Sequence, residues 1–429
     1  TPNYSPGQIE LKVERTGPTP ALTGSVNGDL TYAAGATLSA SVGSTFQDIT
    51  LTNFSSGIST FNGAQYSEVG LLNLDVKDSD YGNVGIIIDT KNANDVNDIA
   101  DIDIGRFIPA YFIQTVKSDG ILNAKHTLAG DCSIKNWAYS GQKTDNKGTV
   151  TYNLMPPEIL ITAFNANDRI TKNYTVSGYM KLELDDIDVG EPIADFEKNR
   201  IDPDVPGEKV KISSEMTRGL SINVEEPGVL NYSFNAEDNF TYEHNAHSLY
   251  EPFPAKIPFT TTRIEDGDSV MLYDGTDPAI SATEDVLSEG IEIRFGRLVL
   301  ENSFGPETSN LPQPMKIEYF DGTNFIVNSD EGCATYDASN ISLNKITDGL
   351  DLADTNAIGG TGDFLTGETR TIELSAPGAG NTGEIGVVYS TFDWLKFDWE
   401  NTGSYDQNPS AIATFGLYRG NDRIISWRE

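Results

Sequence analysis

The sequence predicts an all-β chain of tandem antiparallel β-sandwich domains, of an immunoglobulin-like or jelly-roll-like kind. Apolar and polar residues alternate along much of the 429-residue chain with the two-residue period of half-buried strands. Asn-Gly and Asp-Gly pairs, which suit tight hairpin turns, separate these runs at short intervals. The 40 glycines and 20 prolines interrupt nearly every window that could hold three turns of helix. Many short strands with frequent turns are typical of sandwiches.

The clearest alternation predicts half-exposed strands at 9–14, 180–185, 315–319 and 395–400. Hairpin turns are expected at six dipeptides: Asn27-Gly28, Asn62-Gly63, Asp119-Gly120, Asp274-Gly275, Asp321-Gly322 and Asp348-Gly349. The strongest helical segment, 282–288, is long enough for only about two turns.

The last residues predict a hairpin. Two strands are expected within 413–427, joined at Arg419-Gly420-Asn421-Asp422. We expect this hairpin in the core of its sheet, since removing it would expose Phe415, Leu417, Ile424, Ile425 and Trp427.

The chain is longer than a single hydrophobic core usually supports, so several domains are expected. Segments 101–107 and 292–298 resemble each other, because each places a Gly-Arg pair between apolar residues after an acidic-Ile pair. We interpret both as strands that open a new domain. The predicted domains are 1–105, 106–291 and 292–429. The Pro-rich run 192–206 is a linker or a long connection inside the middle domain, and we favour the second interpretation.

The net charge excludes several classes of partner. The 64 acidic and 29 basic residues give −35, which repels a phosphate backbone, so no nucleic acid is expected as a partner. No stretch approaches the ~20 apolar residues of a membrane span, and membrane insertion is not expected. Solvated carboxylates explain such a charge more simply than cation binding does.

Two cysteines and three histidines (His126, His244 and His247) are too few for a zinc cluster. A disulfide between Cys132 and Cys333 would close a loop of about 200 residues, which the chain-entropy model values on the order of 5 kcal/mol. Two separately buried thiols are the alternative, and both interpretations stay open. The chain starts at Thr1 without a signal peptide, which suggests a processed fragment.

Several motifs point to a known family. The runs 294–307 (RFGRLVLENSFGPE) and 413–429 (ATFGLYRGNDRIISWRE) resemble the C-terminal region of the MSHA pilus biogenesis protein MshQ family. Shorter segments agree in the same order: 66–70, 105–109, 162–166, 171–174 and 377–383. The resemblance implies an exported protein of a Gram-negative bacterium, extracellular or on the cell surface and associated with a mannose-sensitive haemagglutinin type IV pilus. It carries no activity to particular residues.

A carbohydrate site is one chemical hypothesis, because exposed aromatic rings stack on sugars while nearby polar side chains read hydroxyls. The candidate residues are Trp394, Tyr405, Asp406 and Asn408. A tryptophan at an apolar strand position is usually buried, so for Trp399 the core interpretation is favoured.

Calcium binding is a second chemical hypothesis. Asp266, Asp268, Asp274 and Asp277 surround a glycine-containing turn and offer several oxygens to a hard cation. They do not match an EF-hand loop, and Asx-rich turns also stabilise themselves without metal. We therefore expect no required cofactor and keep calcium as an open alternative.

No catalytic residue is assigned from the sequence. A glycan hydrolase needs two carboxylates across a cleft, and Asp393, Asp398 and Glu400 are the natural candidates. The polar face of a half-exposed strand explains Asp398 and Glu400 more simply. Arg106 and Arg297 are interpreted as structural residues in partly buried ion pairs.

The sequence thus predicts a non-enzymatic structural or adhesive surface protein, with pilus or cell-surface proteins and glycans as partners. A lectin-like carbohydrate-binding protein is the alternative, and a secreted glycan hydrolase is the third hypothesis.

Overall fold

The computed structural model describes residues 9–19, 21–32, 36–50, 54–89, 102–125, 134–144, 147–152, 154–190, 210–212, 217–242, 244, 249–273 and 283–417. Its regular elements are β-strands and short 3-10 helices, arranged in many small and mostly antiparallel sheets. The predicted all-β multi-domain fold is confirmed. In the described part, no helix is long and apolar enough to cross a membrane.

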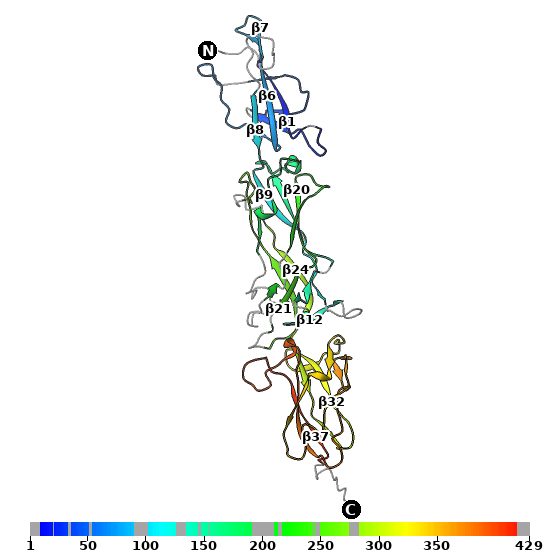
Figure 1. The fold of residues 1–429 in the computed structure, drawn as a ribbon. Coiled ribbons are helices and arrows are strands. Elements are labelled where there is room, and N and C mark those ends of the chain that lie inside the picture. Colours follow the sequence, from blue (N-terminus) through cyan, green and yellow to red (C-terminus); the bar gives the residue numbers. More distant parts are fainter. Residues whose placement is uncertain are drawn as a thin grey trace, which may run out of the picture.

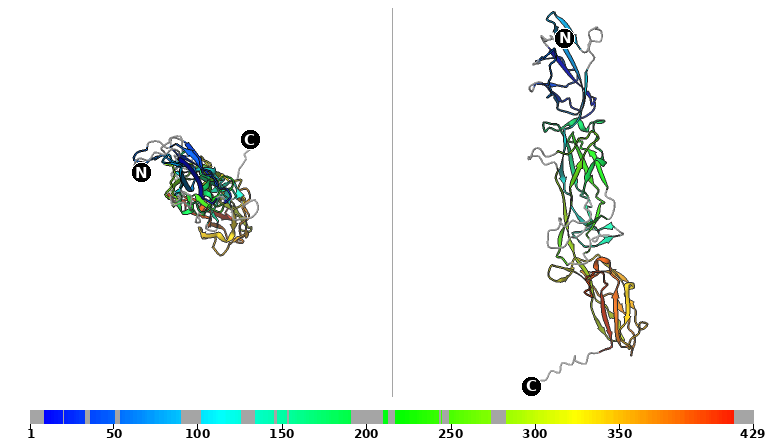
Figure 2. Two further views of the ribbon diagram at one scale, coloured as in Figure 1. Left: turned by 90° about the horizontal axis from the view of Figure 1, so that it is seen from above. Right: turned by 90° about the vertical axis from the view of Figure 1, so that its left-hand side faces the viewer.

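The strands form three bodies that follow one another along a single long axis (Figures 1 and 2). We call them the N-terminal body (strands within 9–107), the middle body (111–294) and the C-terminal body (296–415). The N-terminal and C-terminal bodies lie at opposite ends of the molecule. Each body has its own cluster of buried apolar side chains.

The N-terminal body is built on the long central strand β6, which pairs with β1, β7 and β8. Burial along β1 alternates as the sequence predicts, with Ile9, Leu11 and Val13 inside. A second sheet has the order β3-β2-β5. The strands are β1 (Ile9–Gly17), β2 (Asp29–Tyr32), β3 (Ala36–Ser39), β4 (Gln47–Ile49), β5 (Gln65–Tyr66), β6 (Gly70–Tyr81), β7 (Ile86–Asp89) and β8 (Ile102–Phe107).

The middle body contains sheets of order β19-β20-β16-β9, β11-β10-β15-β21-β18 and β12-β24-β22, with two smaller pairs. Its elements are β9 (Tyr111–Ser118), β10 (Asn123–Lys125), β11 (Ile134–Lys135), β12 (Trp137–Tyr139), β13 (Lys143–Thr144), β14 (Lys147–Gly148), β15 (Val150–Thr151), β16 (Glu158–Phe164), η2 (Lys172–Thr175), η3 (Leu184–Asp186), β17 (Ile187–Val189), β18 (Val210–Ile212), β19 (Arg218–Ile222), β20 (Val229–Phe234), β21 (Asn239–Tyr242), β22 (Phe253–Phe259), β23 (Thr261–Ile264) and β24 (Val286–Arg294).

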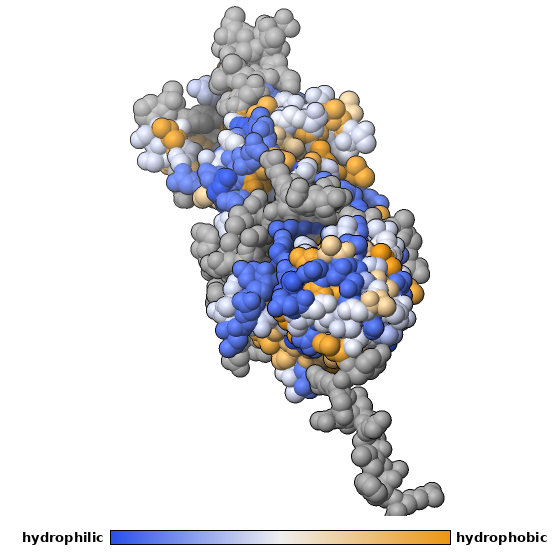
Figure 3. All heavy atoms as spheres, turned by 60° about the horizontal axis from the view of Figure 1, so that its bottom comes forward, coloured by the Kyte–Doolittle hydropathy of each residue, from blue (hydrophilic) through white to orange (hydrophobic). Residues whose placement is uncertain are grey.

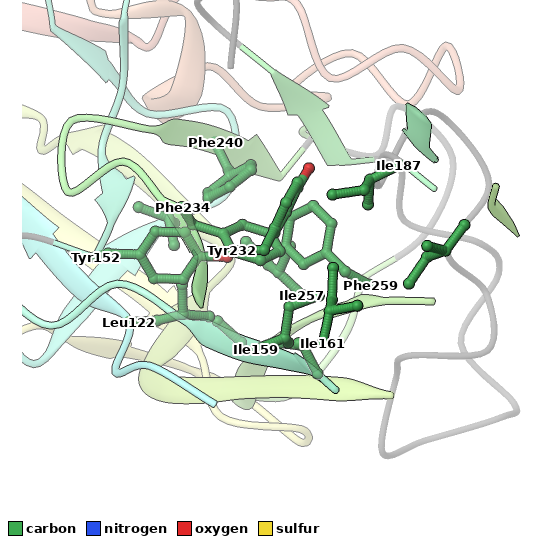
Figure 4. Close-up of a cluster of buried hydrophobic side chains, with 14 of the residues drawn as sticks. Leu122, Tyr152, Ile159, Ile161, Ile187, Tyr232, Phe234, Phe240, Ile257 and Phe259 are labelled. Atoms are coloured by element: carbon green, nitrogen blue, oxygen red, sulfur yellow. The ribbon is translucent and has the colours of Figure 1, made fainter. Parts of the chain in front are cut away.

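Aromatic and branched side chains from several strands fill the core of the middle body (Figure 4). Phe234 and Phe259 meet edge to face with ring centroids 4.8 Å apart, and Tyr152 meets Phe240 at 5.6 Å. Such edge-to-face pairs add to the stabilisation from buried area. Strand β22 carries two prolines and lies at the edge of its sheet, where a missing N–H costs no ladder hydrogen bond.

The C-terminal body has sheets of order β25-β28-β29, β26-β37-β36-β31 and β27-β35-β32. Its elements are β25 (Gly296–Leu300), β26 (Ser303–Gly305), β27 (Leu311–Pro312), β28 (Met315–Phe320), β29 (Phe325–Val327), β30 (Thr335–Asp337), η5 (Ala338–Asn340), β31 (Ile341–Lys345), β32 (Ala357–Ile358), β33 (Thr361–Asp363), β34 (Glu368–Thr369), β35 (Glu373–Leu374), β36 (Gly383–Tyr389), η6 (Asp393–Leu395) and β37 (Ser410–Phe415).

The expected strand at 315–319 is confirmed as β28, but the one at 180–185 is wrong. Leu182 is buried between exposed neighbours, as alternation predicts. Its backbone N–H, however, donates to the Tyr174 hydroxyl at 3.0 Å instead of to a partner strand. The run is therefore an extended segment without a ladder, and it leads into η3.

The expected strand at 395–400 is also wrong. The run begins in η6, and its one strand-like contact is an isolated bridge between Phe397 and Gln407. The expected helix at 282–288 is wrong in its described part, because Val286 to Ser288 opens β24. Three apolar residues in seven cannot distinguish a short helix from a buried strand.

Of the expected turn glycines, Gly28, Gly120 and Gly322 have positive φ angles of 71°, 75° and 101°. Gly63 and Gly349 do not lie in that region, and the 274–275 turn falls outside the described residues.

The Pro-rich run 192–206 also falls outside the described residues. The strands before and after it, β17 and β18, both belong to the middle body. The first strand of the expected C-terminal hairpin is β37, and it is paired on both sides, by β26 and β36. That strand is core, as predicted, and the second strand lies outside the described residues.

Candidate functional site

A cavity of about 320 Å³ lies in the C-terminal body at the end of β36. Antiparallel pairing of β31 with β36 sets Ile341 opposite Tyr389, which brings η5 beside the loop after β36. The Ser390 N–H donates to the Asn340 carbonyl at 2.9 Å and fixes this arrangement. The lining residues are Thr335, Tyr336, Asp337, Asn340, Tyr389, Ser390, Thr391 and Phe392.

The hydroxyl of Tyr389 organises one wall of this cavity. It accepts a hydrogen bond from the Asp337 N–H at 3.2 Å and a longer one from Asn340 Nδ2 at 3.5 Å. Two acceptor positions are all that a phenol oxygen offers, so its own proton remains to be donated.

A carboxylate lies beside that hydroxyl. Asp337 caps η5, and its Oδ1 accepts from the Ser339 N–H at 2.8 Å. This hydrogen bond lowers the pKa of Asp337, because it stabilises the charged form. The cavity therefore presents an ionised acceptor at neutral pH.

Thr391 contributes a polar atom without a partner. Its backbone N–H donates to Asn408 Oδ1 at 3.2 Å. The residue is only 8% exposed, and its Oγ1 has no hydrogen-bond partner among the residues that the structure describes. Buried hydroxyls nearly always have a partner, so this buried Oγ1 keeps hydrogen-bonding capacity that no described residue uses.

Next to Thr391, two aromatic rings form a stacked pair. Phe392 lies parallel to Trp394, with centroids 4.7 Å apart and an interplanar angle of 9°. Phe392 is 39% exposed, and Trp394 packs partly against the buried cluster of the C-terminal body. The exposed ring is thus held in a fixed orientation at the cavity.

A second group of polar residues joins the N-terminal and middle bodies. Asn173, which is fully buried, pairs with the backbone of Val26 as a strand would: its Oδ1 accepts from the Val26 N–H and its Nδ2 donates to the Val26 carbonyl, each at 2.8 Å. Its own N–H donates to Glu68 Oε2 at 3.0 Å. Burial raises the pKa of Glu68, and the Asn173 N–H opposes that shift.

Arg106 supports the same junction from β8. One guanidinium nitrogen lies 2.5 Å from Asp268 Oδ2, and another donates to the Tyr179 carbonyl at 2.5 Å. These contacts agree with the structural interpretation of this arginine.

The junction of the middle and C-terminal bodies is centred on Arg294, which is 8% exposed. Its Nη1 donates to Asn328 Oδ1 at 2.6 Å, and Asn328 Nδ2 donates to the Tyr139 hydroxyl at 2.6 Å. Its guanidinium also lies over the rings of Trp137 and Tyr319, at 5.0 and 4.6 Å. Strand β12 pairs with β24 of the middle body, yet its two aromatic rings belong to the buried cluster of the C-terminal body.

His244 lies in the same junction. Its ring stacks on Phe295 with centroids 4.3 Å apart, and its Nδ1 is 3.1 Å from Ser140 Oγ. Burial lowers the pKa of His244 to about 4. Ser140 is fully buried, whereas His244 is partly exposed.

Two consecutive family domains match most of the chain. The fourth domain of DUF6701 matches residues 294–429, and the third domain of DUF6701 matches residues 68–288, which is more than half of the sequence. The chain belongs to the DUF6701 family. A comparison with curated proteins found no match. In the DUF6701 chain, the boundary at 294 coincides with the end of β24, whereas the match that starts at 68 enters the sheet of the N-terminal body just before β6.

None of the four carbohydrate candidates of this DUF6701 chain is among the residues that line the cavity. Trp394 lies behind Phe392 beside the cavity. Tyr405 instead faces the junction and packs on Phe295 at 5.3 Å. Asn408 holds the Thr391 backbone, and Asp406 is exposed in the same loop.

The hydrolase candidates are occupied with local contacts. Lys396 lies 2.8 Å from Asp393 Oδ1, and this hydrogen bond lowers the pKa of Asp393. Asp398 accepts from the N–H groups of Thr402 and Gly403 at 2.7 and 2.8 Å. Neither has the raised pKa that a catalytic acid requires.

The described calcium candidates are also used within the protein. Asp266, 4% exposed, accepts from the Asp268 and Val270 N–H groups and from the Tyr174 hydroxyl. Asp268 pairs with Arg106. Asp274 and Asp277 lie outside the described residues, and within the described part no group of three or more His, Cys, Asp or Glu could hold a metal.

Arg297 and the cysteines complete the candidates. Arg297 donates from Nε and Nη2 to Glu318 Oε2, and its guanidinium lies 3.6 Å from the Phe325 ring centroid, in agreement with a structural role. Cys333 is disulfide-bonded. The other cysteine of the sequence, Cys132, lies outside the described residues.

Neither the cavity nor the two junctions were predicted from the sequence. The exposed Phe392, two positions before Trp394, is the one local signal that could have indicated the cavity. Asn173 and Asn328 are ordinary loop residues in the sequence, and only the packing of separate bodies gives them their role.

Proposed function

We propose that the chain is a non-enzymatic, extended structural part of a bacterial surface assembly, of the kind associated with an MSHA-type pilus, with an adhesive role. The observation that carries this proposal is the end-to-end order of three β bodies whose two junctions are both built from buried polar contacts (Figure 1). We call such an extended structural part a spacer. A spacer needs an end-to-end order of its bodies, because it must hold its two ends apart.

The junctions have the features of rigid connections. Flexible inter-domain contacts are usually exposed and polar, whereas Asn173, Asn328 and Arg294 are all less than a tenth exposed. Rings of the middle body lie in the core of the C-terminal body, so bending there would open a packed core.

The surface chemistry supports the same proposal. On the face shown in Figure 3, hydrophilic residues predominate and apolar residues are scattered among them. With a net charge of −35, neighbouring copies repel one another and stay dispersed unless a specific contact holds them. The link to a pilus depends on the sequence resemblance alone.

Two measurements test the proposal. Immunogold labelling of intact source bacteria with antibodies to this chain should mark the cell surface or its pili, and a strain without the gene provides the control. Unlabelled intact cells whose thin sections show label in the interior would refute the surface role. Small-angle X-ray scattering should give the maximum dimension of three bodies in line, and a compact particle would refute the spacer.

A further inference from the structure

We propose that the cavity beside Phe392 binds a single neutral saccharide ring. The proposal concerns a site that the spacer function does not need, so either can fail without the other. It differs from the site expected from the sequence, because Tyr405 and Asp406 take no part in it.

The polar groups of the cavity suit a ligand rich in hydroxyls. Thr391 Oγ1 has no partner among the described residues, and the Tyr389 hydroxyl has used its acceptor positions and keeps a proton to donate. Asp337 adds an ionised acceptor. A sugar hydroxyl both donates and accepts, so adjacent donors and acceptors satisfy it better than they would satisfy an apolar or purely anionic molecule.

The stacked ring supplies the apolar contact. One face of a pyranose ring presents C–H groups, and these pack on an aromatic face. Phe392 is 39% exposed and is held parallel to Trp394, so its orientation is fixed before a ligand arrives. Such preorganisation reduces the entropy lost on binding.

Size and charge narrow the ligand class. A volume of about 320 Å³ is at the lower end of ligand pockets, which are about 300–1,000 Å³, and it suits one ring better than a longer oligosaccharide. The charge of Asp337 and the net charge of −35 both disfavour uronic and sialic acids. The ligand class that fits the cavity is therefore a neutral hexose or N-acetylhexosamine.

The test is saturation-transfer NMR and titration calorimetry with the intact chain and four probes: glucose, galactose, N-acetylglucosamine and glucuronate. We expect at least one neutral sugar to bind with a Kd in the millimolar range, about 1 mM, and glucuronate to bind more weakly. Failure of every neutral probe to give saturation transfer overturns the proposal, as does preferential binding of glucuronate.

Three variants locate the binding. Phe392→Ala should weaken it about tenfold through loss of the stacking face, and Thr391→Val, which keeps the shape, should weaken it several-fold. The matched control is Phe304→Ala, which removes a 62% exposed ring elsewhere in the same body and should leave binding unchanged. Thermal melting confirms that each variant folds. Equal binding by Phe392→Ala and the unaltered chain would place the sugar elsewhere and refute this site.

Discussion

Acidification should weaken the junction of the middle and C-terminal bodies through His244. The ring is buried against Phe295 and Ser140, and burial lowers its pKa from 6.5 to about 4. The unfolded chain binds a proton near pH 6.5, while the folded chain resists it until about pH 4. Between these values the unfolded state binds more protons, so stability falls as the pH falls.

The size of this effect follows from the two pKa values. The linkage between proton binding and folding lowers the free energy of unfolding by about 2 kcal/mol between pH 7 and pH 5, and by about 3 kcal/mol between pH 7 and pH 4. Other acidic and basic groups of the chain titrate as well. The informative quantity is therefore the difference in unfolding free energy between the unaltered chain and His244→Gln, compared at the two pH values. We expect His244→Gln to be less stable at pH 7, because the stacked ring is lost, and to lose less stability on acidification.

Urea unfolding at pH 7 and pH 5, followed by tryptophan fluorescence, measures this difference. Phe295→Leu is the matched control, because it weakens the same packing without removing a titratable group, and its deficit should be similar at both pH values. Parallel losses of stability in the unaltered chain and His244→Gln between pH 7 and pH 5 would refute the reasoning.

Three further substitutions test the packing of the bodies. Asn173→Ala should lower the free energy of unfolding by about 2 kcal/mol and increase proteolysis between the first two bodies. The control is Asn167→Ala, at an exposed contact across the same junction, which should change neither quantity much. Gly296→Ala should lower the free energy of unfolding in urea by about 2 kcal/mol, because the added Cβ would lie 2.6 Å from the buried ring of Tyr139. The control is Gly332→Ala, which should change little because the nearest atom to its added Cβ is 3.9 Å away. Arg297→Lys should lower the free energy of unfolding by about 1 kcal/mol in the same assay, because lysine keeps the charge but cannot stack a planar group on Phe325. An unchanged urea midpoint would contradict the structural role of Arg297.

Local pattern predicted the fold where strands are long and half-buried. The alternation of Ile9, Leu11 and Val13 is reproduced in β1, and that of Met315 and Ile317 in β28. At 180–185 the same pattern was misleading. Leu182 is buried but donates its N–H to a tyrosine hydroxyl instead of a partner strand, and Leu184 is exposed.

The cavity and the junctions depend on contacts between distant parts of the sequence. Asn340 and Tyr389 lie 49 positions apart and meet because β31 pairs with β36. Tyr405 occurs in a polar loop that suggests an exposed ring, yet the ring is partly buried against Phe295 and the core cluster of the middle body. Neither relation leaves a periodic signal in the sequence, so neither the cavity nor the environment of Tyr405 could be predicted from it.

Strand β12 makes the two larger bodies dependent on each other for folding. Trp137 and Tyr139 complete the C-terminal core, although they come from a segment more than 150 residues before Arg294. A chain cut just before Arg294 would lack both rings, and its core would contain a void lined by apolar atoms. The C-terminal body can therefore reach its final packing only after β12 has been placed. Along the chain, these two domains are separate segments, but we expect them to unfold as one cooperative unit.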